Sequence, residues 1–405
     1  MRLIYEGSVK RLLERADRSD RLFFQFTDDY SVFDWGKMPD TIKDKGCSLA
    51  LIGAFFFEKL SSPNFFKTLV QSPHLKNFDS IFLTNLFNSP TYKKLESDGL
   101  NSHYIGLHTS EKPLKLDDLD DSPGADKLFL EVQKASVFAP ERRIFDVNQV
   151  YFYPENLESP LNRRLIPLEV VFRFGMPQGS SLKTRLEKDP LYYRKIGLET
   201  EPQENQLFDR PVVEFFTKLE PEDRHLSYQE AALISRLSPA EFEELLDKTR
   251  ALALALYHVF AEIDITLFDG KFEFVLDNTD ETTDGARVVL ADSIGPDELR
   301  LIYKNHHLSK ELLRQYYQKS AWAEAVKQAK LRAKEDPSID FKERCINELG
   351  HSPKPIGIDE KQVIDRLYPV LANTITGRIL FKDAGSLEEL ADSFDQIFSK
   401  TSAGI

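Results

Sequence analysis

Residues 265–300 constrain the fold of this chain more than any other stretch of its sequence. Two runs, 270–276 and 287–291, mix β-branched, aromatic and polar residues on either side of a polar loop, which predicts a β-hairpin with a long tip. Because side chains alternate along a strand, the first run places its charges on one face and its phenylalanines on the other. The charged side chains are Asp269, Lys271 and Glu273, and the phenylalanines are Phe272 and Phe274.

Charged residues also follow the second run of the hairpin. It ends in Asp292, and Asp297 and Arg300 come after the turn signal Gly295-Pro296. Carboxylates at these positions suit Mg²⁺, whereas Lys271 and Arg300 suit anions. The residues alone leave two interpretations open: a metal and anion site, or a solvated face of salt bridges.

Composition limits the classes of protein to which the chain can belong. With 405 residues, of which 41% are hydrophobic and 29% charged, it can form two or three domains around a large core. The formal net charge of −13 argues against general binding to nucleic acid or to an anionic membrane. Two cysteines are too few for a disulfide framework, and no Cys-x-x-Cys zinc signature occurs. Without a signal-like start or a run of about 18 apolar residues, the sequence predicts a cytoplasmic protein.

Two further stretches contain candidate anion-binding residues. In the first, a short strand leads into a turn where Gly7 lets backbone amides approach a phosphate and Lys10 adds a positive charge. An ordinary hairpin turn also fits these residues. In the second, a strand over 168–174 carries Arg173 into a Gly- and Ser-containing turn, which fits either an anion clamp or a surface arginine.

The remaining pattern predicts helices around these strands. A capping box at Ser238 begins a long amphipathic helix that serves as scaffold. Lys310 and Arg314 share a helical face, either within a salt-bridged surface or as a pair directed at an anion. Helices are predicted at 45–60, 238–263, 309–335, 359–374 (interrupted near Pro369) and 386–400, and further strands at 21–26 and 147–153.

Short motifs in order along the chain match the pattern of one known family. They are Tyr5-Glu6-Gly7-Ser8-Val9-Lys10; Asp28-Asp29-x-Ser31-x-x-Asp34; Lys45-Gly46; Ile166-Pro167-Leu168-Glu169-Val170-Val171-Phe172-Arg173 followed by Gly179-Ser180; Lys218-Leu219-Glu220 followed by Asp223; Asp269-Gly270-Lys271-Phe272-Glu273-Phe274; Asp292 followed by Pro296-Asp297 and Arg300; Leu313-Arg314-Gln315; and Ile375-Thr376-Gly377. This series resembles the SAICAR synthetase (phosphoribosylaminoimidazole-succinocarboxamide synthase) family. No single motif is decisive, but the order and spacing are specific and span nearly the whole chain.

The resemblance implies both a fold and an activity. The fold is α+β with two lobes: a β-rich N-terminal lobe over 1–165, a larger α+β C-terminal lobe over 166–405, and an ATP cleft between them. The activity is ATP-dependent ligation of carboxyaminoimidazole ribotide (CAIR) and L-aspartate to SAICAR in purine biosynthesis. ADP and phosphate are released, an acyl phosphate is the intermediate, and ATP and Mg²⁺ are the cofactors. The partners are then small molecules, with neither nucleic acid nor membrane, and a homo-oligomer is compatible.

The resemblance also carries roles over to individual residues. Nucleotide binding falls to Gly7, Ser8, Lys10, Ile166, Leu168, Lys218 and Glu273. Metal binding falls to Glu273 and Asp292. Ribotide binding falls to Arg173, Ser180, Asp297, Arg300 and Arg314. The expected catalytic residues are Lys271, Arg173 and Asp297, with Lys271 near the reacting carboxylate.

Several positions depart from the family pattern. Ser8 replaces a loop lysine, Ser293 replaces the glutamate after the hairpin aspartate, and Glu220 replaces an aspartate. Paired asparagines do not follow Lys45-Gly46, and the segments 61–165 and 277–285 are longer than usual. These differences keep three alternatives open: an amide ligase with another substrate, a small-molecule kinase, and a non-catalytic nucleotide-binding relative.

Overall fold

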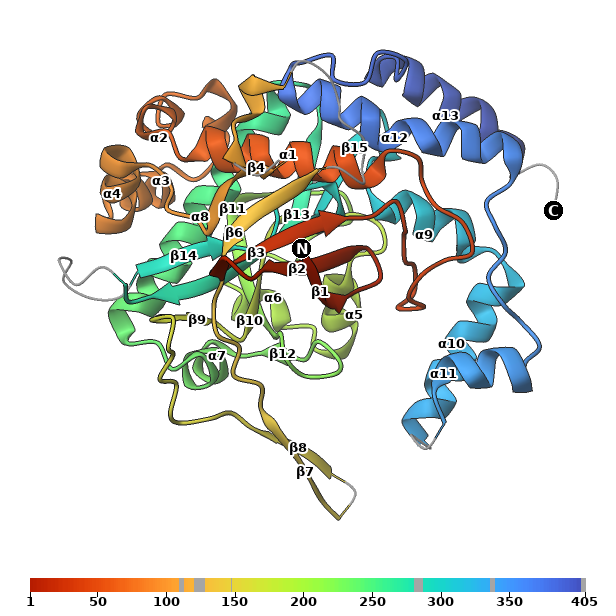
Figure 1. Cartoon of the computed structure of the whole chain (residues 1–405), viewed down its shortest axis with the longest axis horizontal. Coiled ribbons are helices and arrows are strands. Elements are labelled where there is room, and N and C mark those ends of the chain that lie inside the picture. The colour runs from red at the N-terminus through yellow and green to blue at the C-terminus, as the bar shows by residue number, and fades with distance from the viewer. Residues whose placement is uncertain (109–112, 120–127, 147, 280–286, 336–338, 402–405) are drawn as a thin grey trace.

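The computed structural model describes residues 1–108, 113–119, 128–146, 148–279, 287–335 and 339–401 (Figure 1). Two antiparallel sheets form its centre, and most helices lie around them. A single large hydrophobic core contains residues from both sheets. The predicted α+β fold class is confirmed.

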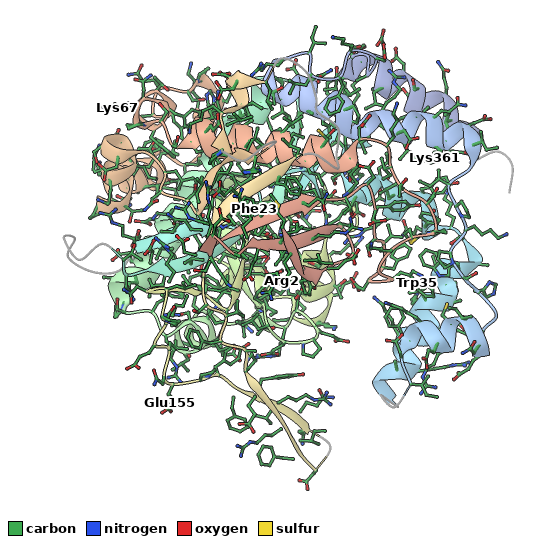
Figure 2. The ribbon with its side chains drawn as sticks, in the orientation of Figure 1. Arg2, Phe23, Trp35, Lys67, Glu155 and Lys361 are labelled. Atoms are coloured by element: carbon green, nitrogen blue, oxygen red, sulfur yellow. The ribbon has the colours of Figure 1, made fainter. Side chains whose placement is uncertain are left out.

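The first sheet comes from the N-terminal part of the chain and has the strand order β1-β2-β3-β6-β4-β5. Its side chains change from exposed to buried from the edge inward: Arg2 on β1 lies at the surface, whereas Phe23 on β3 is fully buried (Figure 2). The strands are β1 (Arg2–Glu6), β2 (Lys10–Arg15), β3 (Arg18–Phe26), β4 (Tyr104–His108), β5 (Pro113–Leu114) and β6 (Phe129–Gln133).

The second sheet is organised around its longest strand, β13 (Thr266–Asp277). Its first half pairs with β10 and β15, and its second half pairs with β14 and β9. The predicted hairpin is therefore confirmed as β13 and β14, and its tip over 280–286 lies outside the described residues. The other strands are β9 (Arg163–Leu165), β10 (Leu168–Gly175), β11 (Leu207–Thr217), β12 (His225–Leu226), β14 (Arg287–Ala291), β15 (Leu299–Tyr303) and β16 (His306–His307).

Helix α1 (Lys45–Leu60) packs on β3 and β4 and on α12 (Ile358–Thr376). Its predicted bounds are confirmed. A Cβ atom on Gly46 would lie 2.4 Å from the carbonyl oxygen of Phe26, so only glycine lets the helix start this close to β3. The backbone amide of Gly46 donates to the Asp28 carboxylate over 2.9 Å, which caps the helix N-terminus.

Two helical predictions need correction. The region 309–335 forms two helices, α9 (Lys310–Gln318) and α10 (Ala321–Glu335), because Ser320 accepts a hydrogen bond from the Ala323 amide and starts a new helix. The predicted break near Pro369 is wrong, since α12 continues through it. Pro369 is buried among neighbours that pack on α1, and this packing offsets the lost backbone hydrogen bond.

The other helices cover the sheets or extend from them. Helix α8 (Pro239–Ala261) starts at the predicted capping box and packs on β10, β11, β13 and β14. The two-stranded pair β7 (Glu141–Phe145) and β8 (Asn148–Phe152) projects from the body (Figure 1). No helix within the described ranges has the length and apolar character needed to cross a membrane. The remaining helices are α2 (Pro63–Leu69), α3 (Ser80–Asn88), α4 (Pro90–Asp98), α5 (Ser181–Lys188), α6 (Tyr192–Lys195), α7 (Tyr228–Ser235), α11 (Phe341–Glu343) and α13 (Leu387–Thr401).

Candidate active site

A cluster of charged side chains lies where β13 changes partners. Strand β13 contributes Lys271 and Glu273, and Asp292 follows β14 one residue beyond the partner of Glu273, which is Ala291. We call the full set the lysine–carboxylate cluster: Lys10, Glu169, Lys218, Lys271, Glu273, Asp292 and Glu298.

Ion pairs connect five members of this cluster, and Lys10 and Asp292 form a separate pair. The Nζ atom of Lys218 lies 3.0 Å from Glu169 and 2.6 Å from Glu273. The Nζ atom of Lys271 lies 2.7 Å from Glu169, 3.6 Å from Glu273 and 3.4 Å from Glu298. Lys271 on β13 and Lys218, one residue after β11, are thus held between the same two carboxylates, Glu169 and Glu273, which fixes their positions.

The cluster contains more negative than positive charge. Three lysines face four carboxylates, so one negative charge is in excess. Burial and the nearby Asp292 carboxylate raise the pKa of Glu273 to about 7. Burial would also raise the pKa of Asp292, but the Lys10 ammonium outweighs it and holds that pKa well below its usual range. A proton or a cation on Glu273 removes the imbalance.

The donor set fits a hard divalent cation. Glu273 and Asp292 offer carboxylate oxygens, the ligands that Mg²⁺ prefers. Among the described residues no group of three or more histidine, cysteine, aspartate or glutamate side chains is arranged to hold a metal. A cation here would therefore need water or phosphate oxygens to complete its shell, as Mg²⁺ does in nucleotide sites.

The N-terminal turn reaches this cluster from the first sheet. The Gly7 amide donates to the Lys10 carbonyl oxygen over 2.9 Å and closes a tight turn between β1 and β2, with Ser8 half-buried within it. The Lys10 ammonium binds the Asp292 carboxylate and lies 4.4 Å from the centre of the Phe24 ring. The structure therefore brings the predicted phosphate loop and the predicted metal residues together.

Arg173 is buried, so its interpretation as a surface arginine is wrong. Its guanidinium donates to Glu214, to Asp269 over 2.9 Å and to the Ser181 hydroxyl over 3.3 Å. The two carboxylates hold it rigidly at the start of α5, as expected of a buried charge.

Two other predicted ribotide residues lie at the same end of β13. Ser180 caps α5 by accepting from the Leu182 amide over 3.3 Å. The Arg300 Nε atom lies 3.5 Å from Asp269, and its Nη1 donates to the Gln178 carbonyl oxygen over 3.5 Å. With Arg173, they place two guanidinium groups beside a helix N-terminus, an arrangement that favours anions.

Asp297 is fixed by two partners that the sequence did not assign to it. It lies 2.8 Å from the Lys45 ammonium and accepts from the Tyr368 hydroxyl over 2.5 Å. Lys45 is 1% exposed, and its Nζ lies 5.2 Å from the centre of the Tyr368 ring. Although burial opposes ionisation, the Lys45 and Lys310 ammonium groups hold the pKa of Asp297 below its usual value.

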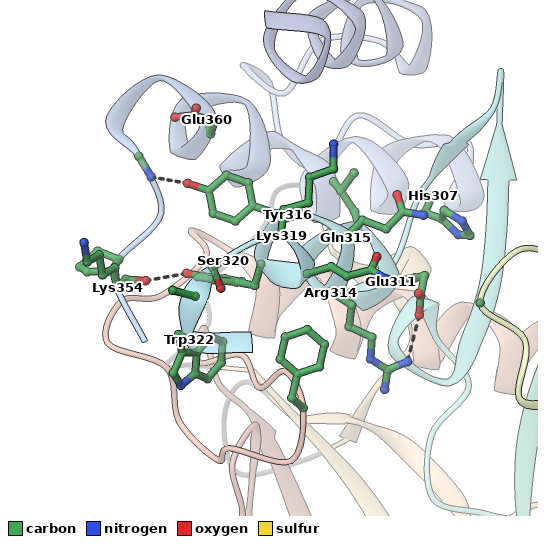
Figure 3. A pocket seen from close by; sticks show the side chains of 18 of the residues that line it. His307, Glu311, Arg314, Gln315, Tyr316, Lys319, Ser320, Trp322, Lys354 and Glu360 are labelled. Carbon is green, nitrogen blue, oxygen red and sulfur yellow. Dashed lines mark hydrogen bonds and ion pairs between the residues drawn. The ribbon is translucent and has the colours of Figure 1, made fainter. Parts of the chain in front are cut away.

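Arg314 lines a cavity of about 990 Å³ between α9 and the segment 351–360 (Figure 3). Its guanidinium donates to Glu311 over 3.0 Å. Gln178 and Gly179 also line the cavity, which connects it to the start of α5. The structure thus places Arg314 near the end of the site that holds Arg300.

The backbone at the predicted adenine segment is already hydrogen-bonded. The Ile166 amide donates to the Phe274 carbonyl oxygen over 2.9 Å, and the Leu168 amide donates to the Ile166 carbonyl oxygen over 2.8 Å. The Pro167 carbonyl oxygen accepts from the Lys218 amide over 3.2 Å. A base at this segment would have to use a second lone pair on a carbonyl oxygen, or packing contacts.

Sequence reasoning missed five residues of the site: Glu169, Glu214, Glu298, Lys45 and Tyr368. Glu169, Glu298 and Lys45 lie in or beside the family motifs, and Glu214 lies on β11, which pairs with β10. An ionisable side chain close to a motif could therefore have indicated these four residues. Tyr368 lies 71 residues from Asp297 inside a predicted helix, and no local pattern marks it.

Comparison with known proteins identifies relatives over nearly the full length. A "Putative phosphoribosylaminoimidazole-succinocarboxamide synthase" from Archaeoglobus fulgidus is 30% identical over 395 residues, covering 96% of this chain and 99% of the relative. A phosphoribosylaminoimidazole-succinocarboxamide synthase from Thermoplasma acidophilum is 24% identical over 386 residues, covering 93% of this chain and 99% of the relative.

A solved structure and a family model complete the comparison. The structure of SAICAR-synthase from Saccharomyces cerevisiae complexed with SAICAR has a TM-score of 0.52 and 20% identity, and the match covers 93% of this chain and 94% of that one. At this identity it shows likeness of fold. The model of the SAICAR synthetase family matches residues 3–329. The chain therefore belongs to the SAICAR synthetase family.

Proposed function

We propose that this protein is an ATP-dependent ligase that condenses CAIR with L-aspartate to give SAICAR, ADP and phosphate. Family membership and near-complete coverage of relatives that bear this enzyme's name support the proposal. The observation that carries it is the distribution of charge along one face of β13. A lysine–carboxylate cluster lies around Lys271 and Glu273, and two arginines meet at Asp269.

Asp269 and Glu273 are four residues apart on this face, or about 13 Å along a strand. Such spacing suits a ligand with a phosphate at one end and a carboxylate at the other. We assign the phosphate end to Arg173, Ser180 and Arg300, where charge-assisted hydrogen bonds from guanidinium groups are strong. Arg314 extends this end into the neighbouring cavity, and Asp297 orients the ribotide from its fixed position.

The carboxylate end is assigned to the lysine–carboxylate cluster. A carboxylate oxygen attacks the γ-phosphorus of ATP, the new O–P bond forms, and the bond to ADP breaks. The aspartate amine then attacks the acyl carbon, the C–N bond forms, phosphate leaves with the C–O bond electrons, and the nitrogen gives up one proton to the departing phosphate. Carboxylates, Glu298 first, outweigh burial and raise the pKa of Lys271 above its usual range, so Lys271 remains a cation that stabilises negative charge in both steps.

The protonation state of Lys271 favours a ligase over a kinase, because a lysine that stays charged cannot serve as the general base for a hydroxyl. A kinase that phosphorylates a hydroxyl needs a general base beside it. The pKa of Lys218 is also raised, because Glu273 and Glu169 outweigh burial. Two permanent cations suit a substrate that is already an anion, which a carboxylate is and a hydroxyl is not.

The nucleotide and its cation are assigned to the other side of the cluster. The turn at Gly7 and Ser8 and the Lys10 ammonium would contact the triphosphate, with Lys218 and the segment from Ile166 to Leu168 nearby. Glu273 and Asp292 would hold Mg²⁺, which when bound neutralises charge on the transferring phosphoryl group. Lys10 would then exchange Asp292 for phosphate oxygens.

The assignment extends to organisation and location. We propose two lobes, 1–165 and 166–405, that meet at this nucleotide cleft. The first sheet then lies in the first lobe, and the second sheet lies in the second lobe except for β9. We also propose a cytoplasmic enzyme of small molecules that binds neither nucleic acid nor membrane. Its net charge of −13 supports the exclusion of polyanionic partners. A homo-oligomer is compatible with these assignments.

The test is ADP release measured with each component omitted in turn. We expect release to require Mg²⁺, CAIR and L-aspartate together. Arg300→Ala should raise the KM for CAIR by about 10- to 100-fold, the cost of losing hydrogen bonds to a charged group. The KM for ATP should stay within about twofold, and the control Arg250→Ala, on helix α8, should match the wild type.

Three results would contradict the proposal. Phosphorylation of a stable hydroxyl compound without aspartate would identify a kinase. Turnover with another carboxylate or amine, but none with CAIR, would identify a divergent ligase. ATP binding without any turnover would identify a non-catalytic relative.

A further inference from the structure

Asp292 has a left-handed backbone conformation, with a φ angle of +60°. Aspartate enters this region more readily than most residues with a side chain, but the conformation still costs free energy unless neighbouring contacts hold it. A contact that holds the Asp292 peptide in place therefore also controls where the carboxylate points.

The side chain of His103 makes a contact of this kind. Its Nε2 atom lies 2.8 Å from the Asp292 carbonyl oxygen, and because a carbonyl only accepts, the imidazole donates. His103 is 5% exposed. Its ring lies 5.7 Å from the rings of both Phe24 and Phe57, measured between centroids, so the imidazole is clamped by aromatic side chains.

The backbone around His103 is equally constrained. The His103 amide donates to the Leu290 carbonyl oxygen over 2.9 Å, and the Gln133 amide donates to the His103 carbonyl oxygen over 2.7 Å. Leu290 belongs to β14 and Gln133 to β6, so this residue joins the two sheets directly behind the hairpin. The donor atom has little freedom to follow Asp292 if the peptide rotates.

We propose that His103 is a positioning residue for Asp292, and through it for the cation that accompanies the nucleotide. The imidazole holds the peptide after Asp292 in one orientation, which keeps the carboxylate turned toward Lys10. Without the donor, the carbonyl would lose its partner in a partly buried place, and the peptide would rotate to find another. This inference depends on the proposed assignment of Asp292 to Mg²⁺.

The test compares three variants by calorimetry of ADP binding, with and without Mg²⁺. His103→Phe fills similar space without a donor, and His103→Gln keeps an N–H that can reach the carbonyl. His108→Phe is the matched control, since His108 is also a buried histidine but contacts Phe23 and Phe129. We expect His103→Phe to weaken the Mg²⁺-dependent part of ADP affinity by about 10-fold or more, the usual effect of losing a group that orients a metal ligand.

The Mg²⁺-dependent part of the ADP affinity should stay within about threefold of the wild-type value in His103→Gln and within about twofold in His108→Phe, because both variants leave Asp292 with a donor. Combining His103→Phe with Asp292→Asn should add no further loss. Equal losses in the two Phe variants, or a loss in His103→Gln as large as in His103→Phe, would overturn the inference. If His103→Phe does not fold, His103→Asn, whose amide is too short to reach, replaces it with the same expectation.

The calorimetry contains neither CAIR nor aspartate, so its outcome is separate from that of the ligase assay. Absence of ligase activity with a normal Mg²⁺ effect on ADP binding would contradict the proposed function only. Absence of any Mg²⁺ effect on ADP binding by the wild-type protein would overturn the inference about His103.

Discussion

Replacing Glu273 with glutamine should stabilise the metal-free protein and abolish its activity. Glu273 is buried in a cluster with one negative charge in excess, and its pKa is raised from 4.5 to about 7. Between pH 4.5 and about 7, Glu273 therefore holds a proton in the folded protein but not in the unfolded chain. Stability then falls as pH rises through this window. A glutamine at this position carries no charge, so the variant lacks this loss.

The structure gives the size of the effect. A pKa shift from 4.5 to about 7 corresponds to about 3 kcal/mol at pH 8, since each unit is 1.36 kcal/mol. For a chain of this length the entropy of unfolding is roughly 0.85 kcal/mol per kelvin, so the melting temperature should rise by roughly 3 to 4 °C. At pH 4.5 the variant and the wild type should melt at nearly the same temperature.

The assay is thermal unfolding in the presence of a chelator from pH 4.5 to 8. Glu243→Gln is the control, because Glu243 is exposed on α8 and should leave the wild-type pH profile unchanged. Addition of Mg²⁺ and ADP should stabilise the wild type and leave Glu273→Gln nearly unaffected. If Glu273→Gln melts at or below the wild-type temperature at pH 8, or keeps the wild-type pH profile, the charge imbalance is not as described.

Three further predictions concern the phosphate turn, the metal and the buried ion pair. In steady-state kinetics Lys10→Ala should raise the KM for ATP by about 10-fold or more, while Ser8→Ala and Ser8→Lys should leave it nearly unchanged. If substitutions at Lys10 and Ser8 are tolerated equally, the turn is not a phosphate cradle. Asp292→Asn should lower kcat by at least about 100-fold with an unchanged far-UV circular dichroism spectrum, and near-normal turnover would exclude it as a metal ligand. Lys45→Met should cost about 3 kcal/mol in denaturant unfolding, because it removes the ammonium partner of Asp297 and leaves that carboxylate with the Tyr368 hydroxyl. Adding Asp297→Asn should recover part of that loss, and no recovery would show that the pair is not the cause.

Local patterns predicted the elements that carry the site. The hairpin could be predicted because alternation along β13 separates charges from phenylalanines, and the bounds of α1 follow from its apolar periodicity. The start of α8 follows from a capping box that the structure contains at Ser238. In each case the signal lies within one turn or one strand of the element that it specifies.

Long-range contacts explain what the sequence did not indicate. A proline normally interrupts a helix, but α12 continues through Pro369 because packing on α1 outweighs the local preference. The sequence alone is compatible with a surface position for Arg173, but Glu214 on β11 and Asp269 on β13 enclose it. The bond from Tyr368 to Asp297 joins α12 to a motif 71 residues away, and no local pattern marks Tyr368.

The most direct test of the proposed ligase reaction follows an oxygen atom. CAIR labelled with ¹⁸O in both carboxylate oxygens should be converted in the presence of ATP, Mg²⁺ and L-aspartate, and the products analysed by mass spectrometry. Attack of the carboxylate on the γ-phosphorus predicts one ¹⁸O atom in the released phosphate and one in the amide of the product. Phosphate without ¹⁸O would contradict an acyl-phosphate intermediate and with it the role assigned to the lysine–carboxylate cluster.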